Sequence, residues 1–88
     1  MKINPMKNKK SRNEVYKTKD IFIASTLFAA EVRLVSTEWL NGECFFCFED
    51  KGKSEDIAKK YFANDLKVSP RKLFNCFKDI KSILFNKR

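Results

Sequence analysis

An Asn-Gly dipeptide between two β-prone runs is the feature that most constrains how this chain folds. Residues 32–50 read VRLVSTEWLNGECFFCFED, so Asn41-Gly42 separates two segments rich in β-branched and aromatic side chains. This dipeptide is a strong signal of a β-hairpin, because both residues readily adopt the positive φ of a type I′ turn. A two-residue loop also sets the register of the strands. The predicted cross-strand pairs are Leu40–Glu43, Trp39–Cys44, Thr37–Phe46 and Val35–Phe48.

The hairpin is expected to have two unlike faces, because successive side chains of a strand point in opposite directions. The face that holds Trp39, Phe46 and Phe48 is mostly apolar and is predicted to contact helices. The other face carries Glu38, Glu43 and Glu49 and is predicted to be half exposed.

Three helices are expected around the hairpin, each with its own start signal. The predicted N-caps are Thr18 for a helix over 19–30, Ser54 for a helix over 55–64, and Ser69, followed by Pro70, for a helix over 70–85. The first helix is apolar on most sides, which indicates either a central position or cover by a partner subunit. The predicted class is α+β, in the order α-β-β-α-(β)-α. The pattern leaves open whether residues 66–68 add a third strand to the hairpin.

The charge is unevenly distributed along the chain. The net charge is +8, and residues 1–13 carry five basic side chains and no acid. Residues 14–66 hold seven bases and ten acids, and residues 67–88 hold seven bases and one acid. Basic ends around a slightly acidic body indicate a polyanionic partner, with nucleic acid first and an anionic membrane second. Charge that serves only solubility is the alternative.

The domain organisation follows from the same pattern. Residues 1–14 are polar and basic and lack an apolar repeat, so they are predicted to form a disordered arm. Residues 15–88 are predicted to form a single α+β domain. The longest apolar run, residues 21–30, is too short to span a bilayer.

The cysteine and histidine content argues against a chemical site. The chain has three Cys and no His, and an odd Cys count without a dense framework favours a reducing, cytoplasmic location. Cys44 and Cys47 lie three apart on one strand, so their thiols are expected on opposite faces and not as a metal or disulfide pair. With no phosphate-binding glycine loop and no acid–base pair evident, we predict no enzyme activity, no metal and no cofactor.

The sequence resembles a family of small bacterial and phage domains of unknown function. The resemblance is carried by Tyr16-x-Thr18-x-Asp20-Ile21, by the strand that ends Cys44-Phe45-Phe46-Cys47-Phe48-Glu49-Asp50, by Tyr61-Phe62, by Val68-x-Pro70-Arg71-x-Leu73-Phe74 and by Lys81-Ser82-Ile83-Leu84. It covers about residues 15–85 and implies one compact domain. It implies no catalytic residue, and the basic arm lies outside it.

Two functional hypotheses remain open from the sequence. The first is a non-enzymatic nucleic-acid-associated protein that makes mainly electrostatic contacts through the last helix and the arm. Its predicted contact residues are Lys7, Lys9, Lys10, Arg12, Arg71, Lys72, Lys78 and Lys81. The second is a protein-interaction or structural module, including a homodimer. Its predicted interface residues are Ile23, Leu27, Phe74 and Phe85.

Overall fold

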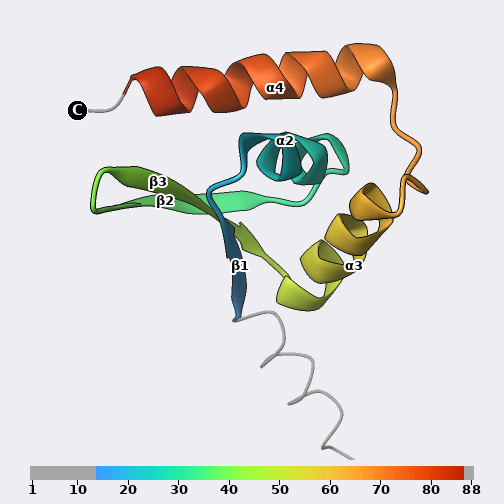
Figure 1. Ribbon diagram of the computed structural model, residues 1–88, viewed down its shortest axis with the longest axis horizontal. Coiled ribbons are helices and arrows are strands. Elements are labelled where there is room, and N and C mark those ends of the chain that lie inside the picture. The colour runs from blue at the N-terminus through green and yellow to red at the C-terminus, as the bar shows by residue number, and fades with distance from the viewer. Residues whose placement is uncertain (1–13, 87–88) are drawn as a thin grey trace, which may run out of the picture.

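A three-stranded antiparallel sheet and three helices make up the part of the chain that this computed structural model describes, residues 14–86. In chain order the elements are β1 (Val15–Thr18), α2 (Ile21–Ala29), β2 (Leu34–Leu40), β3 (Glu43–Glu49), α3 (Lys51–Phe62) and α4 (Pro70–Phe85). Figure 1 shows α2 between the sheet and α4, with α3 at the end of the sheet. The predicted α+β class is confirmed. The predicted arm lies outside the described residues, except for Glu14.

The hairpin register follows the Asn-Gly prediction near the turn. Asn41 and Gly42 both have positive φ, at 52° and 82°, as a type I′ loop requires. Trp39 lies opposite Cys44 and Thr37 lies opposite Phe46. The two-residue loop therefore sets which side chains of β2 and β3 share a face.

Further from the turn, a β-bulge changes the register. Leu34, not Val35, lies opposite Phe48, and the register shifts between Leu34 and Ser36. The predicted Val35–Phe48 pair is therefore wrong, because the bulge leaves one residue of β2 unpaired. Leu34 takes the core-facing place and packs against the core, whereas Val35 is 39% exposed.

The third strand comes from the start of the domain. β1 pairs with the other edge of β3, with Tyr16 opposite Phe48 and Thr18 opposite Phe46, so the strand order is β1-β3-β2. Residues 66–68 form no strand and connect α3 to α4. The described order is thus β-α-β-β-α-α.

Two of the predicted helix caps are wrong. Thr18 belongs to β1, and Asp20 caps α2 by accepting hydrogen bonds from the backbone N–H groups of Phe22 and Ile23 at 2.8 and 3.2 Å. Asp50, with φ of 61°, caps α3 by accepting from Lys53 N at 3.1 Å. At both sites a carboxylate oxygen of Asp, and not the hydroxyl predicted from the sequence, accepts the capping hydrogen bonds.

The residue predicted to cap α3 is instead buried. Ser54 lies inside the first turns of the helix at 0% exposure, and its hydroxyl donates to Glu49 O at 3.3 Å. The third predicted cap is confirmed, since Ser69 accepts from Lys72 N ahead of a helix that starts at Pro70.

The core forms where α2 covers one face of the sheet. Phe46 and Phe48 of β3 are fully buried, and Ile23 and Leu27 of α2 belong to the same cluster. Ile80 of α4 closes this cluster at 0% exposure. The apolar character of α2 on most sides is thus explained by its central position between the sheet and α4.

The opposite faces of β3 give a matched test of this core. Phe46→Ala should lower the free energy of unfolding by about 3–5 kcal/mol, because it leaves a cavity beneath α2. Phe45→Ala, one residue away on the open face and only partly buried, should cost about 1 kcal/mol. Urea denaturation followed by circular dichroism measures both. Equal losses would show that the faces are wrongly assigned.

Candidate nucleic-acid interface

Helix α4 forms the outer layer of the fold and buries only one side. Ile80 is its one fully buried residue among those described, while Leu73, Phe77 and Leu84 are partly buried. Phe74 and Phe85 remain 65% and 73% exposed. A helix with this arrangement leaves most of its surface available to a ligand.

Three cations on α4 have no ionic partner among residues 14–86. Arg71 and Lys78 are exposed, Lys81 is partly exposed, and none of them lies within 4.0 Å of a described carboxylate. Lys72 differs, since its Nζ lies 2.6 Å from Glu31 Oε2. That hydrogen bond, together with the charge of Lys72, lowers the pKa of Glu31.

The unpaired cations and the exposed phenyl rings share one side of α4. At 100° per residue, Phe74, Lys78, Lys81 and Phe85 fall within about 60° of arc around α4, and Arg71 falls about 20° beyond this arc. Asp79 lies about 140° from Phe74 on the same wheel. We call Arg71, Phe74, Lys78, Lys81 and Phe85 the aromatic–basic stripe.

Ring contacts connect this stripe to α2. The Nζ of Lys81 lies 5.4 Å from the ring centroid of Phe77 and 5.7 Å from that of Phe85. Phe77 in turn stacks on Phe22 of α2, with centroids 5.5 Å apart and ring planes 7° apart. The cation–π contacts hold Lys81 over aromatic rings while its charge stays unpaired by any described acid.

The interface predicted from the sequence is only partly exposed. Ile23 and Leu27 are 3% and 0% exposed because both face the core, so their prediction as partner-binding residues is wrong. Phe22 is 55% exposed and is not among the residues predicted from the sequence. The arm residues Lys7, Lys9, Lys10 and Arg12 lie outside the described residues, so their role stays a prediction.

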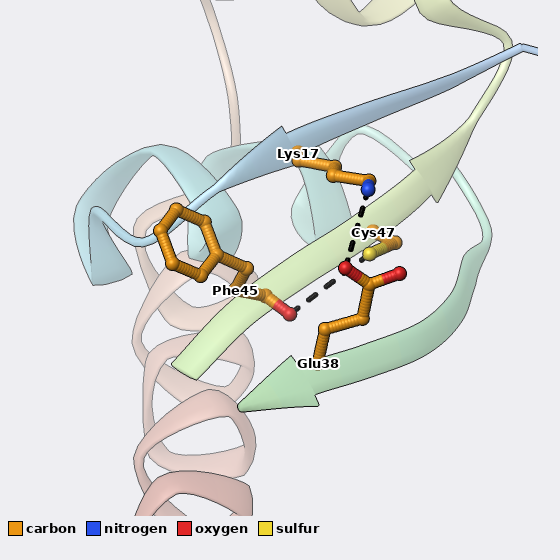
Figure 2. A network of polar contacts seen from close by, with 4 residues as sticks. All are labelled: Lys17, Glu38, Phe45 and Cys47. Carbon is orange, nitrogen blue, oxygen red and sulfur yellow. Dashed lines mark hydrogen bonds and ion pairs between the residues drawn. The ribbon is translucent and has the colours of Figure 1, made fainter. Parts of the chain in front are cut away.

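The open face of the sheet has a different electrostatic character. Each of its three carboxylates faces a base: Glu38 with Lys17 at 3.2 Å, Glu43 with Lys19 at 3.0 Å, and Glu49 with Arg33 at 3.6 Å. Figure 2 shows Lys17 of β1 and Glu38 of β2 meeting across β3, beside Cys47. These pairs neutralise the face, so it offers a polyanion no surplus of positive charge.

The cysteines form no ligand set. Cys44 lies on the core face of β3 and Cys47 lies on the opposite face, at 4% and 1% exposure. Burial is the main cause that raises the pKa of the Cys44 thiol, and the nearby Cys47 raises it further. The described part of the chain contains no group of three or more His, Cys, Asp or Glu side chains that could hold a metal ion. Between residues 14 and 86, no helix has the length and apolar character needed to cross a membrane.

Comparison with known proteins adds no relative: no family model, no curated protein and no solved structure matches this chain. The resemblance to small bacterial and phage domains stays a prediction from the sequence.

The thiols give a direct test of this geometry. At pH 8, iodoacetamide should modify the half-buried Cys76 of α4 first, and should reach Cys44 and Cys47 only after denaturation. Mass spectrometry of tryptic peptides measures the order, with Cys76→Ser as the control. Tight zinc binding that protects Cys44 and Cys47 together would contradict this account.

Proposed function

We propose that this protein is a non-enzymatic, cytoplasmic, nucleic-acid-associated protein whose aromatic–basic stripe and N-terminal cations bind phosphates without strong sequence preference. One observation carries the proposal. The three stripe cations have no described acidic partner, whereas the three bases of the sheet face are each paired with a carboxylate.

Unpaired cations contribute to phosphate binding in a way that paired ones do not. A nucleic acid releases condensed counterions when a free Lys or Arg takes their place, and this release drives non-specific binding. A base already paired to a carboxylate brings no net charge to the phosphate. Arg71, Lys78 and Lys81 therefore support binding at α4 and not at the sheet.

Affinity measured across a salt series tests this proposal. Binding of labelled single-stranded DNA, duplex DNA and RNA should weaken linearly in a plot of log K against log salt concentration. Replacing Arg71, Lys78 and Lys81 together by Gln should make the slope for single strands shallower by about 2. The absence of any binding at low salt would refute the proposal.

A matched control comes from helix α3. Lys51, Lys53 and Lys59 are exposed and lie in no ion pair between described residues, so their replacement by Gln removes the same charge from another helix. This control should change the slope by less than half as much, because Glu55 and Asp56 lie on the same helix and offset part of its positive charge. Replacing Lys7, Lys9, Lys10 and Arg12 by Gln should also make the slope shallower, and no change would remove the arm from the proposal.

The alternative function, a homodimeric interaction module, rests on the exposure of Phe74 and Phe85. Two copies joined through these rings should show twice the chain mass in light scattering, and Phe74→Ser with Phe85→Ser should restore the monomer. The aromatic–basic stripe disfavours such a homodimer, because the dimer would bring the stripe cations of the two copies together. A salt-resistant dimer lost in the Ser variants would favour the alternative.

A further inference from the structure

A cavity of about 210 Å³ lies where α2, the end of α3 and α4 meet. Its walls are the rings of Phe22, Tyr61, Phe74 and Phe77, and Ser25 and Thr26 of α2 also line it. Phe22 and Phe74 are more than half exposed, at 55% and 65%, so the cavity is reached from solvent between exposed rings.

The lining favours the flat face of a ring over a strongly polar group. The hydroxyls of Ser25 and Thr26 already donate to Ile21 O and Phe22 O at 2.6 and 2.8 Å. The remaining lining is aromatic or aliphatic. An apolar cavity of about 150 Å³ admits a benzene ring, so this space is large enough for one planar ring.

The positive charge around the cavity favours a ligand in which that ring is attached to anionic groups. The Nζ of Lys81 lies 5.4 Å from the ring centroid of Phe77, which lines the cavity. Phe74 belongs both to the cavity lining and to the aromatic–basic stripe. Arg71 and Lys78 are the other unpaired cations of the stripe. A ligand that joins planar rings through negative charges meets both requirements.

We infer that this cavity is a base-binding pocket, and that the ligand of the stripe is single-stranded nucleic acid. The inference rests on the proposed function and narrows it, since a duplex keeps its bases paired and stacked. One base enters against Phe22, Phe74 and Phe77 while the adjoining phosphates lie along the stripe. Base stacking on aromatic rings is tolerant of sequence, which agrees with the scarcity of free polar groups in the lining.

The length of the stripe sets the expected size of the ligand. Arg71 to Phe85 spans about 21 Å along the helix, at 1.5 Å per residue. That length corresponds to roughly six stacked nucleotides at 3.4 Å each. A twelve-nucleotide strand therefore covers the stripe fully.

A second copy of the chain is a poorer occupant. A phenyl ring from another molecule has a suitable shape, but the same surface would bring its own Arg71, Lys78 and Lys81. Like charges facing one another across an interface are unfavourable. The charge of the stripe therefore favours a polyanion.

The experiment compares three ligands of equal length with the full chain at low salt: a labelled dT12 strand, a twelve-base-pair duplex and an abasic twelve-unit strand. The dT12 strand should bind at least about tenfold more tightly than the abasic strand, which has the phosphates and no bases. Phe74→Ala should weaken dT12 binding by about fivefold to a hundredfold. The same variant should leave abasic-strand binding unchanged.

Leu40→Ala is the control. Leu40 is 53% exposed at the end of β2 and does not line the cavity, so its loss should leave all three affinities unchanged. Circular dichroism checks that each variant is folded, which is expected because both side chains are exposed.

The outcomes separate the inference from the proposed function. Equal affinity for dT12 and the abasic strand, with no effect of Phe74→Ala, overturns the pocket and leaves the phosphate-binding proposal standing. No binding to any of the three ligands overturns both. Binding to vesicles of anionic lipid that depends on Phe74, without binding to dT12, also overturns both and makes the stripe a membrane contact.

Discussion

The burial of β3 beneath α2 is the interaction on which the rest of this structure depends. Phe46 and Phe48 are both 0% exposed, and they meet Ile23 and Leu27 in a single cluster. Large aromatic side chains bury much apolar area per residue, which matters in a domain this small. Because β3 is also the central strand, the same residues pair with β1 and β2 while they hold the helix.

The central place of α2 determines the character of α4. Since α2 fills the space above the sheet, α4 packs on α2 and contributes one fully buried side chain, Ile80. Its other sides face solvent, and there the sequence places unpaired cations beside exposed rings. The outer surface of α4 therefore carries cations that no described acid pairs, whereas the charges on the open face of the sheet are neutralised by ion pairs.

Local signals accounted for the parts of the fold that depend on neighbours in the chain. Asn41-Gly42 gave the turn and the register next to it, and Ser69-Pro70 gave the start of α4, because each acts within a few residues. The bulge at Val35 was not predicted, since it depends on how Leu34 packs against the core. β1 was missed although Val15, Tyr16 and Thr18 all favour strands, because a run of four residues is short and its partner β3 lies some thirty residues away.

The candidate site was predicted only in part, because some of its contacts join residues that lie far apart in the chain. The cations of α4 were found from the charge pattern, but pairing of Lys72 with Glu31 joins residues 41 apart and could not be read from the sequence. Ile23 and Leu27 were misplaced because a helix covered on two sides has no single apolar face. The pocket joins residues of three helices, and among its rings only Phe74 is predicted from the sequence as an interface residue.

The most direct test of the account is a map of the ligand contact by NMR. A ¹⁵N-labelled sample of the full chain titrated with dT12 reports on each backbone amide. The account predicts that the largest shift changes occur along α4 and at the start of α2, around Phe22, with small changes at β2 and β3. Changes centred on the open sheet face, around Glu38 and Phe45, would contradict it.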